Sequence, residues 1–212
     1  RTLPKVRIHS GINLERALTH IGTNLMQTLE PQMQYLYIPY KDQSNISLYD
    51  TTLLQDDYDG LFRERRFSGL DRIAEANQVS WGLTSRILDS GNDELFHFSL
   101  GRIFYLNDRR AKTDNSAQIE EDKSAIAAEL FFQLDKRWQL NGDIQFNPDT
   151  DETDKGQISL DYFHNENHQF QLNHRYSRDV SGNSIEQMSM FSTFAINDKW
   201  QFVGRYTRDL ER

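Results

Sequence analysis

Apolar and polar residues alternate one by one along much of this chain. Between residues 138 and 146, every second residue is apolar or glycine, and the residues between them are polar. A period of two residues is typical of a β-strand with one apolar and one polar face. The same alternation recurs at 79–87, 126–134 and 200–206. The chain is therefore predicted to be all-β.

Ten strand-like stretches follow this pattern. They lie at 4–15, 24–39, 76–89, 93–106, 123–135, 138–148, 156–164, 168–178, 184–196 and 199–208. Most exceed the roughly 5–6 residues of an ordinary soluble strand. They approach the roughly 9–11 residues with which a tilted strand crosses a bilayer. We expect an antiparallel up-and-down meander of about ten strands.

The connections between these stretches alternate in length. Short ones, rich in turn-forming residues, lie at 90–93, 134–137, 165–167 and 197–199. Longer polar ones lie at 40–75, 107–122, 149–155 and 179–183. Outer-membrane barrels have brief periplasmic turns and long outer loops. The alternation therefore predicts part of a large transmembrane β-barrel, although alternating strands also occur in soluble antiparallel sheets.

In such a barrel the two faces of each strand have different surroundings. The candidate lipid-facing residues are Trp138, Leu140, Ile144, Phe146, Phe170, Leu172, Trp200 and Phe202. The candidate lumen-facing residues are Asn141, Asp143, Gln145, Asn173 and Arg175. Trp138 and Trp200 each follow a short turn, which predicts that both lie at one membrane interface. Packing in a protein core is the alternative for these tryptophans, and solvation in a wet interior for the polar residues.

Composition and charge narrow the possible functions. The chain has 212 residues, a net charge of −8 and a mean hydropathy of −0.75, and it has no cysteine. Without a Lys/Arg-rich block it lacks the electrostatic footprint of a nucleic-acid-binding protein. No apolar run approaches the roughly 20 residues of a membrane helix. No nucleophile-elbow, zinc-protease or phosphate-loop motif occurs, so we expect no enzyme activity and no cofactor.

Residues 40–75 contain too many Leu, Ile, Phe and Tyr for a solvated loop, so we expect them to pack against the lumen or a partner. The candidate contact residues are Asp56, Asp57, Tyr58, Arg63, Arg65, Arg66 and Arg72. The acidic stretch 56–60 lacks the spacing of a calcium loop, and a solvated turn, or pairing of its carboxylates with the nearby arginines, is the stronger hypothesis. His164, His168 and His174 likewise favour surface histidines over a metal site.

Two long stretches resemble a known family. They are TLEPQMQYLYIPYKDQSNI at 28–46 and YDTTLLQDDYDGLFRERRFSGLDRIAEANQVSWGLTSRI at 49–87. Weaker similarity continues through 133–149 and 195–209. These residues are similar to the LptD family of LPS-assembly proteins, also called organic solvent tolerance proteins.

The resemblance implies an outer-membrane β-barrel of a Gram-negative bacterium that delivers lipopolysaccharide (LPS) to the outer leaflet. It also implies an LptE-like plug lipoprotein and a periplasmic LPS-transport bridge as partners, besides outer-membrane lipids. We expect residues 1–212 to be a segment of the barrel domain, without the family's jellyroll domain, late cysteine pair and final strands. The alternative is a soluble all-β carbohydrate-binding or interaction module that uses its loops for recognition.

Overall fold

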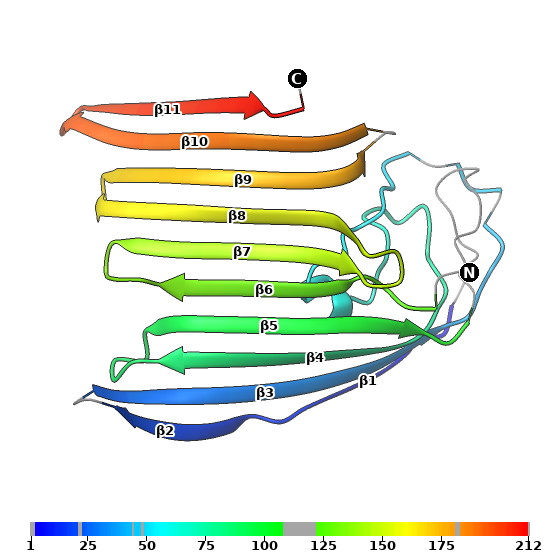
Figure 1. Ribbon diagram of the computed structural model, residues 1–212. Coiled ribbons are helices and arrows are strands. Elements are labelled where there is room, and N and C mark those ends of the chain that lie inside the picture. Colours follow the sequence, from blue (N-terminus) through cyan, green and yellow to red (C-terminus); the bar gives the residue numbers. More distant parts are fainter. Residues whose placement is uncertain are drawn as a thin grey trace.

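The computed structural model describes residues 3–20, 23–43, 45–47, 49–107, 122–180 and 183–211. These residues form eleven antiparallel strands and one short 3₁₀ helix, η1 (Asp59–Phe62), as Figure 1 shows. The strands are β1 (Val6–Gly11), β2 (Leu14–His20), β3 (Thr23–Ile38), β4 (Ala76–Leu88), β5 (Glu94–Tyr105), β6 (Ile126–Gln133), β7 (Trp138–Asn147), β8 (Glu152–Asn165), β9 (His168–Val180), β10 (Asn183–Asn197) and β11 (Trp200–Asp209). From β3 onwards, each strand pairs with the next one along the chain. The predicted all-β antiparallel meander is confirmed.

The described sheet is open, with β1 and β2 at one edge and β11 at the other. The predicted strand at 4–15 covers β1 and only the first two residues of β2, which extends to His20. The two strands pair in one continuous register with β3. At the break, the Ile12 N–H donates to the Pro31 carbonyl at 3.0 Å. Pro31 has no N–H to donate in return, so one hydrogen bond of the ladder is missing there. The proline accounts for the interruption.

The turns at one end of the sheet are short, as predicted, and lie at 89–93, 134–137, 166–167 and 198–199. Trp138 and Trp200 begin β7 and β11 at this end. At the other end, β3 and β4 are joined by the long connection 39–75, and residues 108–121 between β5 and β6 lie outside the described residues. The predictions of long connections at 149–155 and 179–183 are wrong. Strand β8 begins at Glu152 and β9 extends to Val180, so only 148–151 and 181–182 separate the strands.

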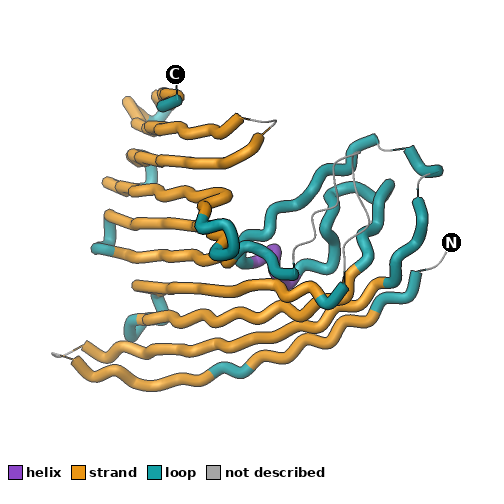
Figure 2. Tube along the Cα trace, turned by 45° about the vertical axis from the view of Figure 1, so that its right-hand side comes forward, coloured by secondary structure: helices purple, strands orange, loops and turns teal. Residues whose placement is uncertain are grey.

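The long connection distinguishes the two faces of the sheet. In Figures 1 and 2 this segment folds back from the ends of the strands, and η1 packs on β4 and β5. We call the covered side, which carries Ser80, Gly82 and Thr84, the inner face, and the opposite side the outer face. The strand register then assigns alternate residues of all the strands to these two faces.

The buried core lies between the long connection and the inner face. Tyr58 and Leu61 from the connection pack with Ile103 of β5 and Ala127 of β6. The outer face has no such cover in the described structure, and large apolar side chains remain exposed on it. None of the helices among the described residues has the length and hydropathy of a membrane-spanning helix.

Candidate functional site

The most elaborate site in the described structure is the contact between the long connection and the inner face. We call residues 40–75 the inner loop. This loop places η1 over strands β4 and β5. Leu61 is completely buried there, and Tyr58 is 5% exposed. Phe62 packs against the same cluster and makes an edge-to-face contact with Tyr58 at 5.9 Å between ring centroids. The prediction that this segment packs rather than remaining solvated is confirmed.

Two glycines make room for these side chains. Gly82 of β4 and Gly101 of β5 lie directly opposite each other in the sheet. A Cβ atom on Gly82 would lie 2.7 Å from the Tyr58 hydroxyl and 2.8 Å from the Phe62 ring. On Gly101 it would lie 2.7 Å from a methyl carbon of Leu61. The absence of side chains at this pair therefore leaves the notch into which the inner loop fits.

Several of the polar groups that the inner loop buries are hydrogen-bonded. The Tyr58 hydroxyl accepts hydrogen bonds from Gln32 Nε2 at 3.1 Å and from Thr84 Oγ1 at 2.9 Å. Thr84 Oγ1 also lies 2.9 Å from Ser99 Oγ. The Ser80 hydroxyl, completely buried, donates to the Leu61 carbonyl at 2.6 Å. Because buried polar groups are costly when unpaired, this network favours the docked position of the inner loop.

The inner loop is also held together internally. Asp57 accepts a hydrogen bond from the Gly60 N–H at 2.7 Å, and it forms an ion pair with Arg63 at 3.4 Å. The Arg63 guanidinium also donates to the Gln55 carbonyl at 3.0 Å. Thus one of the carboxylate–arginine pairings predicted for this stretch is present, and it closes the turn that leads into η1.

A second contact joins the inner loop to the edge strand β1. Glu64 forms ion pairs with Lys5 and with Arg7, the latter at 3.3 Å. The hydrogen bond from Lys5, with the positive charges of Lys5 and Arg7, lowers the pKa of the Glu64 carboxyl below its ordinary value. Arg7 Nε also donates to Gln34 Oε1 at 2.6 Å. The inner loop therefore connects β1 with β4 and β5.

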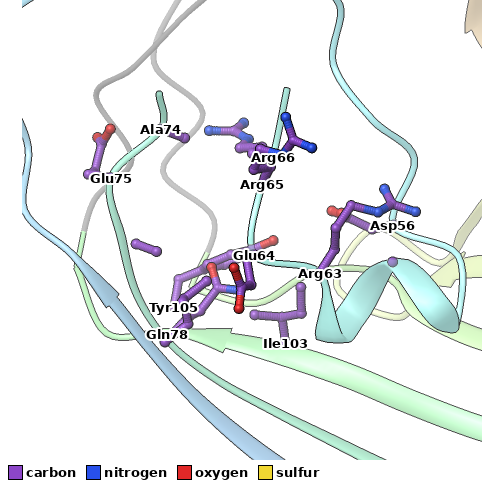
Figure 3. Close-up of a pocket in the computed structure, with 13 residues that line it drawn as sticks. Asp56, Arg63, Glu64, Arg65, Arg66, Ala74, Glu75, Gln78, Ile103 and Tyr105 are labelled. Carbon is purple, nitrogen blue, oxygen red and sulfur yellow. The ribbon is translucent and has the colours of Figure 1, made fainter. Parts of the chain in front are cut away.

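Above η1 the inner loop and the sheet enclose a pocket, shown in Figure 3. Its charged lining residues are of both signs: Asp56, Arg63, Glu64, Arg65, Arg66 and Glu75. Ile103 and Tyr105 of β5 contribute to the rest of the lining. The structure thus brings Asp56, Arg63, Arg65 and Arg66 of the predicted contact residues around one pocket. Tyr58 lies in the core instead, and Arg72 donates to the carbonyls of Gln43 and Ile46.

The predicted lumen-facing and lipid-facing residues lie on opposite faces of the sheet. Asn141, Asp143 and Gln145 of β7 and Asn173 and Arg175 of β9 share the inner face with the loop-covered residues of β4. The register places the other set on the outer face: Trp138, Leu140, Ile144, Phe146, Phe170, Leu172, Trp200 and Phe202.

The inner face also carries a polar cluster that the sequence did not single out. Asp161 of β8 accepts hydrogen bonds from Asn141 at 2.9 Å, from Ser159 at 3.1 Å and from Gln171 at 2.6 Å. Asp161 is 7% exposed. Three adjacent strands thus share one carboxylate on the inner face. The polar character of each residue was visible, but their convergence depends on the register of the three strands.

The metal-site hypotheses receive no geometric support. Within the described residues, no group of three or more His, Asp or Glu side chains is arranged to hold a metal ion. His168 contacts Asn165 and the Ala195 carbonyl, at 2.7 and 3.1 Å. His174 lies 3.0 Å from Glu186. These histidines are thus engaged locally, near the surface of the sheet.

Comparison with known proteins identifies relatives over the whole chain. The family model described as "LptD: LPS transport system D" matches residues 1–203. The chain is 47% identical over 212 residues to the LPS-assembly protein LptD of Pseudoalteromonas translucida (strain TAC 125). It is 43% identical over 212 residues to that of Pseudoalteromonas atlantica (strain T6c / ATCC BAA-1087). These alignments cover 100% of this chain and 28% of each relative, so the chain spans less than a third of their length.

Proposed function

This chain belongs to the LptD family, and from that premise we propose that it forms part of the wall of an outer-membrane β-barrel that delivers LPS to the outer leaflet. The relatives are named LPS-assembly proteins. In this proposal the free edges of the sheet pair with neighbouring strands of the barrel, because a bilayer does not tolerate unpaired strand edges. The protein acts without bond chemistry: its wall keeps hydrocarbon on one side and water on the other.

The observation that carries this proposal is the apolar character of the outer face. Large apolar side chains stay exposed on it from the first strand to the last, for example Ile8 at 61%, Ile158 at 49% and Phe202 at 56%. Soluble proteins seldom expose contiguous apolar patches larger than a few hundred Å². This exposure favours a wall in lipid over the alternative of a soluble carbohydrate-binding module.

The inner face supports the proposal that one side of the wall faces water. Between β7 and β9 it presents mainly amide, carboxylate and guanidinium groups, which suit a hydrated interior. The 3₁₀ helix of the inner loop packs on β4 and β5 and has no contact of that kind with β7, β8 or β9. We propose that an LptE-like plug lipoprotein and the sugar head of LPS lie against the polar inner face of these later strands. LPS would arrive through a periplasmic bridge, and the setting would be a Gram-negative outer membrane.

Spin labels test the wall assignment directly. In the full-length protein in outer-membrane vesicles, single nitroxide labels would be placed at residues 140, 142, 144 and 146 and at residues 139, 141, 143 and 145. We expect the first set to be relaxed by oxygen, which partitions into lipid, and the second by a water-soluble nickel chelate. Equal accessibility of the two sets to the nickel chelate would overturn the proposal.

A further inference from the structure

The part of the inner loop that carries η1 lies against the inner face of the sheet. We call this part, residues 55–64, the strap. The glycine notch holds its middle, where Leu61 is completely buried. At its end, Glu64 forms ion pairs with Lys5 and with Arg7 of β1. These contacts favour the docked position of the strap.

Two carboxylates of the sheet lie beside the docked strap. Glu129 of β6 and Asp143 of β7 are directly opposite each other in the register, and both are on the inner face. Like charges that lie directly opposite each other in an antiparallel pair are destabilising. The sheet fixes this pair whether the strap is docked or released.

The strap brings two further carboxylates to this pair. Asp57 comes shortly before η1, and Asp59 is its first residue. The charges of Asp59 and Asp57 act on Glu129, and the charge of Asp57 acts on Asp143 as well. Docking therefore gathers four negative charges, and these repel one another.

Two basic side chains offset part of this repulsion. Arg63 forms an ion pair with Asp57, and both residues belong to the strap. This pair can persist when the strap is released, so it does not favour docking by itself. His97 of β5 acts on Glu129, and it also contacts Glu94. Both His97 and Glu129 belong to the sheet, so their attraction likewise does not depend on docking.

The residues paired with the two sheet carboxylates on their other sides carry no charge. Ser99 of β5 lies opposite Glu129, and Gln157 of β8 lies opposite Asp143. Lys155 of β8 lies one inner-face position further along. A proton bound to one of the carboxylates would therefore relieve the repulsion between the strap and the sheet.

We propose that the strap docks against an electrostatic repulsion from Glu129 and Asp143, so that proton uptake by these carboxylates tightens the docking and their ionisation loosens it. Because docking brings the four carboxylates together, the docked state binds a proton more readily than the released state. A fall in pH therefore favours docking. This inference goes beyond the proposed function, because it concerns the contact between loop and sheet and not the surroundings of the outer face.

Glu64 sets the lower end of this pH range. The hydrogen bond from Lys5, with the charges of Lys5 and Arg7, lowers the pKa of the Glu64 carboxyl below its ordinary value of 4.5. The contribution of its ion pairs is fully present above 4.5 and is lost as the pH falls through the lowered pKa. We expect the strap to be docked most firmly at mildly acidic pH, above 4.5.

Hydrogen exchange measures the release of the strap in the full-length protein, purified in a neutral detergent. The amides of Leu61 and Arg63 donate to main-chain carbonyls within the strap. A single helical turn is not stable alone, so protection of these amides reports docking. After correction for the intrinsic effect of pH, we expect protection to be about threefold higher at about pH 5.5 than at about pH 8. Equal or lower protection at the acidic pH would overturn the proposal.

Two variants assign the response to the sheet carboxylates. Glu129→Gln and Asp143→Asn each remove one negative charge and nearly preserve the shape of the side chain. Each should raise protection by about threefold at about pH 8 and reduce the difference between the two pH values. The matched control, Asp209→Asn, removes a carboxylate from the inner face of β11, far along the sheet from the strap, and should behave as the unaltered protein does. Unchanged protection in both Glu129→Gln and Asp143→Asn would refute the proposal.

His97→Gln separates the carboxylates from the histidine, since histidine is the side chain that ordinarily changes its charge in this pH range. The pH response should persist in this variant. If it disappeared in His97→Gln and persisted in Glu129→Gln, it would belong to the histidine, and the proposal would be wrong. Hydrogen exchange of the strap does not depend on the spin-label pattern, so the wall assignment and this inference can fail separately.

Discussion

Gly82 lies directly opposite Gly101 in the register of β4 and β5, and the two together leave the notch in which the inner loop rests. Neither glycine is needed here for an unusual backbone conformation. Each is needed because Tyr58, Phe62 or Leu61 occupies the space where its side chain would be. The position of this glycine pair in the sheet thus determines where the inner loop packs.

A methyl group at Gly82 should therefore loosen the inner loop. In Gly82→Ala the new Cβ would overlap Tyr58 and Phe62, and overpacking of this kind costs about 1–3 kcal/mol. We expect faster proteolytic cleavage within residues 40–75 of the folded full-length protein. Gly142→Ala is the control, because a Cβ there would meet its nearest atom at 3.7 Å, an ordinary contact. Equal cleavage rates in the two variants would mean that the notch does not hold the loop.

The Tyr58 hydroxyl offers a test of the buried network. Tyr58→Phe removes the group that accepts hydrogen bonds from Gln32 and Thr84, which leaves the part-buried Gln32 amide without this partner. We expect the inner loop to be destabilised by about 1–3 kcal/mol, measured as a shift in the urea concentration at which it becomes cleavable.

Thr84→Val provides the second arm of a double-mutant cycle with Tyr58→Phe. Because the two hydroxyl groups lie 2.9 Å apart, removing both should cost less than the sum of the single changes. Strict additivity would show that the two groups do not interact in the folded protein.

The two faces of β7 should respond differently to a charge. Ile144→Arg places a guanidinium on the outer face, where a midplane position in a bilayer costs roughly 2–4 kcal/mol. Asp143→Arg places the same group on the inner face, directly opposite Glu129 of β6. We expect the first variant to reduce the heat-modifiable, folded fraction of the full-length protein in outer membranes and the second to leave it near normal. Equal losses would contradict the assignment of the faces.

The alternation along single strands was sufficient to predict the fold class and the two faces of the sheet. It did not predict which residues of neighbouring strands lie side by side. Gly82 falls on the polar face of the alternation at 79–87, yet its role depends on Gly101 being its partner in β5. Asp161 likewise becomes the centre of a cluster only when β7 and β9 bring Asn141 and Gln171 to it. The register between two strands depends on both of them, so it cannot be predicted from the residue pattern of one strand.

The connection predicted at 149–155 was too long because the sequence there lacks the alternation of the other strands. Residues 152–155 read Glu-Thr-Asp-Lys, which is polar on both faces, so the alternation that identified the other strands is missing. In the structure they continue β8, paired with β7, at the end of the sheet opposite the short turns. A strand segment without a buried face needs no apolar residues, and its sequence then resembles a loop.

The inner loop should also respond to acid through Asp71. Its carboxylate accepts hydrogen bonds from the main-chain N–H groups of Tyr49 and Asp50, and these bonds lower its pKa below the ordinary value of 3.8. A pKa lowered in the folded state means that the contribution to stability is fully present above the ordinary value and is lost as the pH falls through the lowered one. We expect the amides of Tyr49 and Asp50 to lose protection from hydrogen exchange, beyond the intrinsic effect of pH, only below the ordinary pKa. In Asp71→Asn, which has no charge to lose, protection should be lower at neutral pH and should not change further on acidification. If the variant and the unaltered protein gave the same protection at every pH, the Asp71 carboxylate would not be what holds this part of the loop.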